Sequence, residues 1–289
     1  MAAGKAPNGK LSAENPHARF DEGERQTLFD VRGLRVTYRR PGERPVEAVK
    51  GVDFTLRDGE TLGIVGESGS GKSTIAKALM LLQPISGGEV LFRGRSLSSF
   101  TAAERRAYRR DVQMVFQDAV GSLNPRMTVR QTLEEAIRHQ GGEANPQARI
   151  AELLSIVGLS DAVAGQYPHE MSGGQCQRVS FARALAAGPR VLVADEPVSA
   201  LDVSVQARIL NLMRDLRRTL GLAVILIAHD LAVVRNVCDR VCVMHRGVFE
   251  DVGPAEDVFA NPKSDYPRQL LSAVPDVTRE LSRRNVRHP

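Results

Sequence analysis

The chain of 289 residues, 42% hydrophobic and 25% charged, is long enough for one large globular domain or two small ones. Its longest wholly apolar run, residues 222–228, is far shorter than the roughly 20 residues that cross a bilayer, so we expect no membrane-spanning helix. The net charge of +5 is compatible with nucleic acid, with an anionic membrane surface or with neither. The cysteines Cys176, Cys238 and Cys242 form neither an even disulfide framework nor a paired metal-binding spacing, which indicates buried packing residues in a reducing compartment.

The amino-terminal residues 1–27 are predicted to be a disordered tail, because residues 1–24 are polar and contain no apolar stretch. The same feature argues against a secretory signal, so we expect the protein to stay in the cytoplasm. Residues 29–39 and 46–56 then alternate between apolar and polar side chains, which predicts two antiparallel strands joined by a turn. Tyr38, in the first strand, is either a nucleotide-stacking group or an ordinary strand aromatic.

Residues 61–74 predict a phosphate-binding loop between a strand and a helix. Four residues separate Gly66 from the run Gly71-Lys72-Ser73, and glycines at these positions let successive N–H groups point at phosphate oxygens. Lys72 would reach the terminal phosphates, and the Ser73 hydroxyl would hold Mg²⁺. The alternative is a flexible glycine turn between two buried elements.

Residues 101–111 predict a helix with a basic face formed by Arg105, Arg106, Arg109 and Arg110. We interpret this face as solvated, because Tyr108 is the single aromatic residue beside it and a base-stacking platform uses several. Residues 112–116 are mostly apolar and predict a largely buried strand. Gln117 follows this strand, either as a functional side chain or as a polar residue that closes it.

Residues 118–185 are predicted to be a helical segment inserted into an α/β chain. Apolar stripes predict helices around residues 133–137 and 150–157, whereas residues 162–170 are predicted to be a loop. The run Ser172-Gly173-Gly174-Gln175 then opens a further helix and would provide a second anion-binding helix end. Ser-Gly-Gly is also an ordinary turn, so both interpretations stay open at this point.

Two fully apolar strands are followed by acidic and histidine side chains. Residues 191–194 predict a strand buried on both faces, which ends at Asp195 and Glu196. The two acids are either structural ion-pairing groups or a Mg²⁺-organising aspartate with a glutamate base, and the phosphate loop favours the second interpretation. Residues 223–228 predict another such strand, which ends at His229. Because ligands bind at the carboxyl ends of strands in open parallel sheets, we expect these groups to meet the phosphate loop at one edge.

These residues together resemble the nucleotide-binding subunit of ABC transporters, over roughly residues 28–275. The family's motifs occur in the family's order: the Walker A loop at residues 66–73, the glutamine loop at Gln117, the signature sequence at residues 172–175, the Walker B end at Asp195 and Glu196, the D-loop at residues 199–202 and the switch histidine at His229. Tyr38 matches the position at which the family stacks an aromatic ring on adenine. Cys176 stands where the family often has a polar residue, and the sequence offers no reason for it.

The resemblance implies an α/β fold with a RecA-like P-loop NTPase core, an N-terminal antiparallel β subdomain and an α-helical insertion subdomain. The core and the β subdomain would comprise residues 28–117 and 186–252. The helical signature subdomain would comprise residues 118–185, and a C-terminal extension residues 253–289.

The resemblance also implies an ATPase with ATP and Mg²⁺ as its cofactors. ATP would contact Tyr38 and the loop residues Gly66, Glu67, Ser68, Gly69, Ser70, Gly71, Lys72, Ser73 and Thr74. Ser73, Gln117 and Asp195 would hold the metal. Glu196 would polarise the attacking water and His229 would contact the γ-phosphate, with Gln117 and Lys72 as further catalytic residues. In the family, the segment matching Ser172, Gly173, Gly174 and Gln175 completes the ATP site of a second subunit in a head-to-tail dimer.

Within that family, residues 116–118, 122–127 and 266–271 are similar to the oligopeptide, dipeptide and nickel importer branch. The expected partners are a second, non-identical ABC ATPase subunit, two membrane permeases and an extracytoplasmic substrate-binding protein. The subunit would lie at the cytoplasmic face of the cell membrane as a peripheral protein. Peptide is the expected cargo, with nickel or glutathione as the alternatives.

A different class is a soluble ABC ATPase that acts on nucleic acid or ribosomes. DNA-repair members separate the two halves of the site by long coiled coils, whereas a short helical insertion joins Gln117 to Ser172 here. Ribosome-acting members generally carry two tandem cassettes, and this chain has one. A simple phosphotransferase would leave residues 172–175 unexplained. We therefore expect no nucleic-acid partner.

Overall fold

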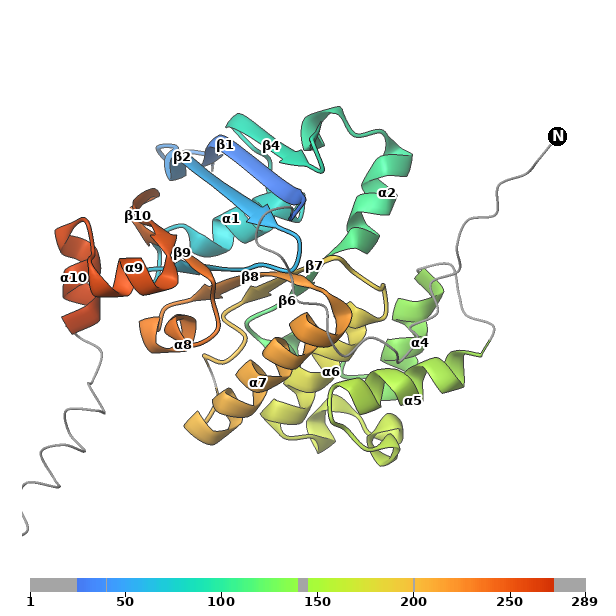
Figure 1. Cartoon of the computed structure of the whole chain (residues 1–289). Coiled ribbons are helices and arrows are strands. Elements are labelled where there is room, and N and C mark those ends of the chain that lie inside the picture. The colour runs from blue at the N-terminus through green and yellow to red at the C-terminus, as the bar shows by residue number, and fades with distance from the viewer. Residues whose placement is uncertain (1–24, 40, 140–144, 200, 273–289) are drawn as a thin grey trace, which may run out of the picture.

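The computed structural model describes residues 25–39, 41–139, 145–199 and 201–272, which form two β-sheets and the helices packed around them (Figure 1). Most of the tail predicted for residues 1–27 and the end of the predicted C-terminal extension lie outside the described residues. Within the described part of the chain, no helix is both long and apolar enough to cross a bilayer.

The smaller sheet is antiparallel and has the strand order β2-β1-β4-β5. Its strands are β1 (Thr27–Tyr38), β2 (Val46–Arg57), β4 (Gly87–Phe92) and β5 (Arg95–Ser96). β1 and β2 pair from Thr27 opposite Arg57 to Tyr38 opposite Val46, as the alternating pattern predicts. Apolar side chains on alternate positions of both strands are fully buried, because one face of the sheet covers the interior.

The larger sheet has the strand order β10-β9-β3-β8-β7-β6. Its strands are β3 (Thr61–Val65), β6 (Val112–Val115), β7 (Val191–Asp195), β8 (Ala223–Ala228), β9 (Arg240–His245) and β10 (Val248–Pro254). All neighbours pair in parallel except β10, which is antiparallel to β9. β3, β7 and β8 are buried at every position, which explains why their sequences are almost entirely apolar.

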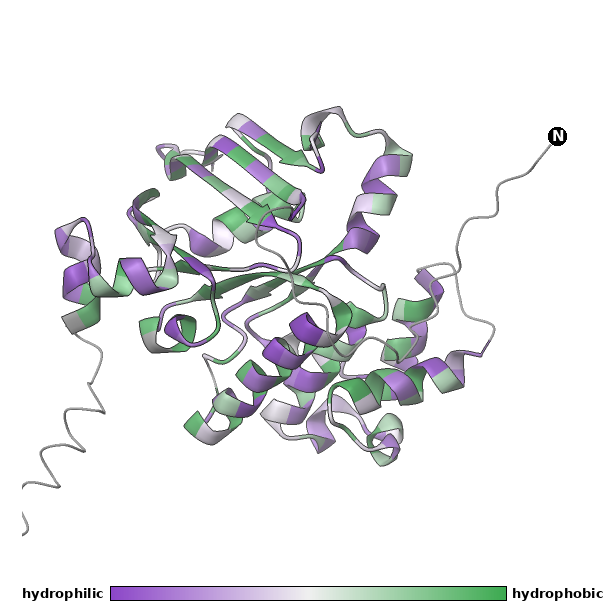
Figure 2. Ribbon diagram, in the orientation of Figure 1, coloured by the Kyte–Doolittle hydropathy of each residue, from purple (hydrophilic) through white to green (hydrophobic). Residues whose placement is uncertain are grey.

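Two hydrophobic cores cover the two faces of the larger sheet. The first core lies between this sheet, the smaller sheet and helix α1 (Lys72–Leu79). The second core lies between the sheet and the helices on its other face (Figure 1). Consecutive residues of β8 point to opposite faces of the sheet, so Ile225 is in the first core and Leu226 in the second. Figure 2 shows the central strands as hydrophobic and the helices as mixed in polarity, as expected for such layers.

The segment predicted to be helical contains α3 (Ala119–Ser122), α4 (Val129–His139), α5 (Pro146–Ile156) and α6 (Gly173–Leu185). The loop predicted at residues 162–170 instead includes two 3₁₀ helices, Asp161–Gly165 and Pro168–Glu170. The Ser160 side chain caps the first, and Pro168 occupies the first position of the second. Helices α7 (Val203–Leu220) and α8 (Leu231–Arg235) follow β7 and β8.

Helix α2 (Ala102–Asp111) carries the basic face on exposed residues and one buried tyrosine. Thr101 and Glu104 form a capping box at its start. The Tyr108 ring makes edge contacts with Phe29, Phe92 and Phe100, and its hydroxyl donates to the Leu79 carbonyl oxygen. Tyr108 is therefore a core residue and is not available for stacking beside the basic face.

Charged side chains close the amino ends of β3 and β9. Glu60 is 2% exposed and pairs with Arg240 at 3.0 Å. Asp239 accepts from the Thr61 N–H at 2.8 Å and pairs with Arg217 of α7 at 2.7 Å. The Asp239–Arg217 pair fastens the sheet to α7, and both pairs lie at the end of the strands opposite the phosphate loop. The extension after β10 adds α9 (Ala255–Ala260) and α10 (Asp265–Ser272), which the sequence pattern did not predict.

Candidate functional site

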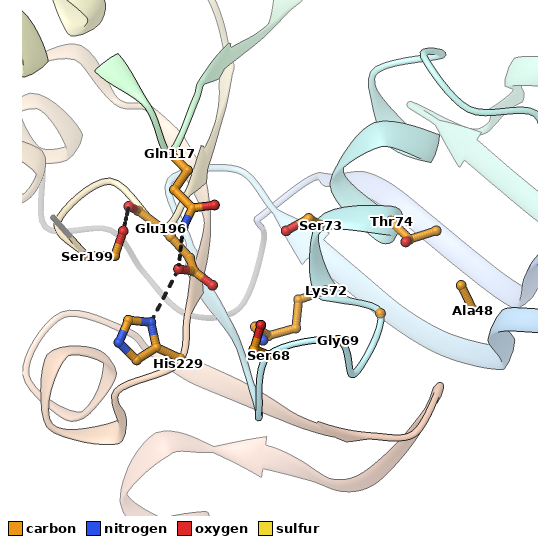
Figure 3. Close-up of a pocket in the computed structure, with 11 residues that line it drawn as sticks. Ala48, Ser68, Gly69, Lys72, Ser73, Thr74, Gln117, Glu196, Ser199 and His229 are labelled. Carbon is orange, nitrogen blue, oxygen red and sulfur yellow. Dashed lines mark hydrogen bonds and ion pairs between the residues drawn. The ribbon is translucent and has the colours of Figure 1, made fainter. Parts of the chain in front are cut away.

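The carboxyl ends of four neighbouring parallel strands, β3, β8, β7 and β6, meet at one edge of the larger sheet. The loops that follow them line a cavity of about 590 Å³. Its lining residues are Ala48, Ser68, Gly69, Gly71, Lys72, Ser73, Thr74, Gln117, Glu196, Ser199 and His229 (Figure 3). The predicted meeting of the phosphate loop, the acidic pair and His229 at one edge is therefore present in the structure.

The loop between β3 and α1 has a backbone that only glycine fits at two positions. Gly66 has φ 154°, and a Cβ there would lie 2.0 Å from the Met244 carbonyl oxygen. Gly71 has φ 114°, and a Cβ there would lie 2.4 Å from the Ala48 carbonyl oxygen. The loop is thus pressed against β2 and β9, and it places the first turn of α1 at the cavity. The free N–H groups of a helix start favour an anion there.

Lys72 is the buried cation of this loop. Its side chain is 3% exposed, and Nζ donates to the Gly66 carbonyl oxygen at 2.8 Å and to the Glu67 carbonyl oxygen at 2.7 Å. Burial lowers the pKa of Lys72, while the charges of Glu196 and Asp195 act in the opposite direction. Two carbonyl oxygens thus fix the ammonium beside the cavity, where a phosphate can reach it.

Ser73 and Asp195 form a pair of hard oxygen donors. The Ser73 hydroxyl donates to the Asp195 carboxylate at 2.9 Å, and Asp195 is 6% exposed at the end of β7. Burial raises the pKa of Asp195, and the Ser73 hydrogen bond partly offsets this. No group of three His, Cys, Asp or Glu side chains among the described residues suits a metal ion. A hydroxyl and one carboxylate fit Mg²⁺, which takes few protein ligands and completes its shell with water and phosphate oxygens.

Glu196 collects hydrogen bonds from the ends of two other strands. Its Oε2 accepts from Gln117 Nε2 at 3.0 Å and lies 3.3 Å from His229 Nδ1 (Figure 3). The residue has φ 45°, a backbone conformation uncommon for a side chain of this size. The Ser199 hydroxyl donates to the Glu196 carbonyl oxygen at 3.1 Å. A carboxylate held in this way can accept a proton from a water molecule in the cavity.

The residues 172–175 do not line this cavity. Ser172 caps α6, with its hydroxyl accepting from the Gln175 N–H at 3.3 Å, and Ser172 and Gly173 are exposed. A Cβ on Gly174 would lie 2.7 Å from Val205 of α7, so glycine allows the two helices to approach closely. This helix start faces outward and is free to contact another molecule.

Tyr38 lies at the margin of the site without lining the cavity. Its hydroxyl is 3.3 Å from the Thr74 hydroxyl in the first turn of α1. Two lining residues, Ala48 and Ser199, were not among the predicted site residues. Ser199 belongs to the D-loop motif, which was a usable signal, whereas Ala48 is a small strand residue that has no sequence signature.

A glycine-rich loop with a buried lysine, opposite a serine–aspartate pair and a glutamate, defines a P-loop NTPase site on an α/β sheet. The chain also matches the ABC transporter family model over residues 49–199. The oligopeptide transport ATP-binding protein OppF of Lactococcus lactis subsp. lactis (strain IL1403) is 48% identical over 246 residues, which are 84% of this chain and 77% of OppF. The chain therefore belongs to the ABC transporter ATPases, whose nucleotide is ATP.

Two further comparisons agree with this membership. The glutathione import ATP-binding protein GsiA of Escherichia coli (strain K12) is 48% identical over 279 residues, which are 92% of this chain and 45% of GsiA. A dimeric post-hydrolysis structure of the ATP-binding cassette MJ0796, bound to ADP and Pi, superimposes with a TM-score of 0.71 and 30% identity. It covers 79% of this chain and 99% of the cassette. These relatives confirm the predicted family and fold.

Proposed function

We propose that this chain is the ATP-hydrolysing subunit of an importer that takes up peptides through partner permeases. The observation that carries the proposal is the single cavity in which Lys72, Glu196 and His229 meet, although they follow three different strands. The 48% identity to OppF, whose name states oligopeptide transport, supports the peptide cargo.

The phosphate loop binds the triphosphate of ATP in this proposal. Loop residues that line the cavity, from Ser68 to Thr74, supply backbone N–H groups, and the Lys72 ammonium neutralises the terminal phosphates. Tyr38 would place its ring against adenine, and its contact with Thr74 supports this role because it keeps the tyrosine beside the loop. Mg²⁺ would be held by Ser73 and Asp195, with Gln117 as a third ligand, and would neutralise charge on the phosphate oxygens.

Glu196 is the proposed base for the attacking water. Gln117 and His229 contact the same carboxylate oxygen, so they orient it toward the cavity. His229 is half-exposed at 52%, which leaves its ring able to turn toward a γ-phosphate. The cluster thus provides a proton acceptor and two polar groups at the position of the reacting water.

A second ATPase subunit would complete the site. The exposed helix start at residues 172–175 supports this proposal. Its backbone N–H groups are suited to bind a phosphate, but they do not line this chain's own cavity, so the phosphate would belong to ATP on a second subunit. The dimeric state of the MJ0796 cassette is consistent with such an arrangement.

The permeases would bind in a groove of about 700 Å³ beside the helical segment. The groove is lined on one side by Leu82, Phe116 and Arg109 and on the other by residues of α3, α4 and α6. Leu82 is 60% exposed and Phe116 is 39% exposed, which is a reason to expect an apolar partner there. In this proposal the subunit would lie at the cytoplasmic membrane face as a peripheral protein, and an extracytoplasmic binding protein would deliver the peptide on the other side.

Glutathione is the second candidate cargo, because the chain is 48% identical to GsiA as well as to OppF. Growth of a strain lacking this subunit on oligopeptides, and separately on glutathione as sulfur source, distinguishes the two cargoes. If neither uptake is lost, both of these cargoes are ruled out and nickel is the remaining alternative.

The assembled complex gives the direct test of the ATPase roles. Glu196→Gln should keep MgATP affinity within about twofold and lower turnover by at least about 10²-fold, the scale of general-base loss. Lys72→Ala should weaken MgATP binding itself by at least about tenfold. Glu256→Gln, an exposed change on α9, is the matched control and should leave both unchanged. Equal turnover of Glu196→Gln and wild type would remove Glu196 as the base.

A further inference from the structure

The carboxyl-terminal helix α10 contacts the phosphate loop through one side chain. The Tyr266 hydroxyl accepts a hydrogen bond from the Glu67 backbone N–H at 3.0 Å. The ring of Tyr266 stacks on His245 at the end of β9, with centroids 3.9 Å apart and an interplanar angle of 12°. A residue of the extension is therefore in direct contact with the nucleotide loop, 199 positions along the chain.

The hydrogen bond has a consequence on the opposite side of the same peptide group. The Glu67 N–H and the Gly66 carbonyl belong to one planar trans peptide, so they point in opposite directions. Tyr266 holds the N–H outward, and the Gly66 carbonyl then faces inward, where it accepts from Lys72 Nζ at 2.8 Å. Gly66 has no Cβ and would otherwise allow this peptide to rotate easily.

The stacked pair is itself anchored to the strand that supports the loop. The Met244 carbonyl oxygen lies against Gly66, and the Gly247 N–H donates to the Ser70 carbonyl oxygen at 2.9 Å. Tyr266 is packed against the second core, so its ring is fixed independently of the loop. Burial raises the pKa of Tyr266, which keeps the phenol neutral.

We propose that Tyr266 is a positioning residue for ATP binding: it fixes the Gly66–Glu67 peptide, and through it the Lys72 ammonium, in the orientation that receives phosphate. This inference rests on the proposed function of Lys72. The extension after β10 is then part of the nucleotide site of this chain, although none of its residues lines the cavity.

The test is Tyr266→Phe in the full chain, which keeps the ring on His245 and removes only the acceptor. Loss of one neutral hydrogen bond predicts a rise of about 3- to 10-fold in the dissociation constant for MgATP. In the assembled complex KM should rise by the same factor, with kcat within about twofold. The Glu67 amide resonance should move upfield in proton frequency and exchange faster with solvent, which verifies that the hydrogen bond is lost; the rise in KM without a change in kcat is the result that a role in docking α10 alone would not give.

Arg268→Gln is the matched control on the same helix, because Arg268 is 58% exposed and pairs with Asp265 on the surface. It should change neither the Glu67 amide nor the MgATP affinity. A Tyr266→Phe protein with wild-type affinity and an unmoved Glu67 amide would overturn the inference. Lys72→Ala separates the two proposals: if it binds MgATP normally, the proposed function fails, and if it alone is impaired while Tyr266→Phe is not, only the positioning role fails.

Discussion

Asp195 lies at a position that favours the neutral form of its carboxyl group. Its side chain is 6% exposed, and burial is the main reason that its pKa lies above the ordinary aspartate value. Because the unfolded chain releases this proton at lower pH than the folded chain, ionisation of Asp195 lowers the stability of the folded protein. A bound cation would favour the ionised form, as the Ser73 hydrogen bond and the charges of Lys77 and Lys72 already do.

Asp195→Asn should raise the melting temperature of the nucleotide-free protein at pH 7. The asparagine oxygen can still accept from Ser73, while the buried charge is gone. The gain in melting temperature should shrink as pH falls from the pKa of Asp195 in the folded chain to the ordinary aspartate value. Below that value Asp195 is neutral in both the folded and the unfolded chain, so the substitution no longer removes a charge. Scanning calorimetry at several pH values checks this, and a lower melting temperature at pH 7 would contradict it. The variant should also lose Mg²⁺-dependent nucleotide binding.

Two glycines of the phosphate loop are required for different reasons: Gly66 because a Cβ would clash with its neighbours, and Gly69 because of its positive φ alone. Gly66→Ala would place a Cβ 2.0 Å from a carbonyl oxygen, whereas a Cβ on Gly69, at φ 80°, meets nothing within 4 Å. Gly69→Ala should therefore cost about 1–3 kcal/mol through backbone strain alone. Gly66→Ala should cost more and raise the dissociation constant for MgATP at least about tenfold beyond the Gly69 variant. Urea unfolding and calorimetric titration measure both, and equal effects would show that close packing against β9 is unimportant.

At the scale of elements, the structure joins the segment after Gln117 to the signature helix. Arg183 of α6 donates to the Ser122 carbonyl oxygen at 2.6 Å and lies 3.3 Å from the Ser122 hydroxyl. Burial lowers the pKa of Arg183. The two contacts with Ser122 hold the buried guanidinium in place. These contacts connect α3, which follows Gln117, to α6, which begins at Gly173.

Arg183→Gln should lower the free energy of unfolding by about 1.5–3 kcal/mol, because a shorter side chain loses hydrogen bonds from a charged donor. Arg268→Gln removes a pair with exposed side chains and should change it by less than about 1 kcal/mol. Urea denaturation of both variants gives the comparison. Similar losses would mean that the α3–α6 contact adds nothing beyond a surface ion pair.

Some elements were predictable from local sequence and others were not. Residues 191–194 and β8 are uninterrupted apolar runs, and the glycine spacing marks a loop between β3 and α1, so these elements were predicted correctly. The short helices α9 and α10 and the 3₁₀ helices have too few apolar residues to show a period. The reason for Cys176 at a position where the family often has a polar residue was also not evident from the sequence. In the structure Cys176 is fully buried, and its Sγ lies 3.5 Å from the Pro168 carbonyl oxygen. The contact of Tyr266 with Glu67 joins distant segments and has no local signal.

At the scale of the whole molecule, the larger sheet divides the interior into two hydrophobic cores, one on each of its faces. Cys242 packs in the first core and Cys238 in the second. Burial raises the pKa of Cys242 to about 12 and raises that of Cys238 as well. Both thiols are protonated and inaccessible in the folded protein, which agrees with their interpretation as packing residues.

A thiol-reactive dye at pH 8 should label none of the three buried cysteines rapidly in the folded chain, and all of them once urea unfolds it. Labelling in the absence of urea should follow the opening of the cores and slow further when MgATP is added, because nucleotide stabilises the folded state. Rapid labelling of the native protein would show that one of the cores opens locally.

The ion pairs at the amino ends of β3 and β9 lie at the opposite end of the sheet from the cavity. Active sites commonly sacrifice stability for turnover, and here the stabilising ion pairs and the catalytic groups lie at opposite ends of the same strands. Directed evolution for heat tolerance can therefore concentrate on the neighbourhood of Glu60 and Asp239, where substitutions leave the rate of ATP hydrolysis unchanged.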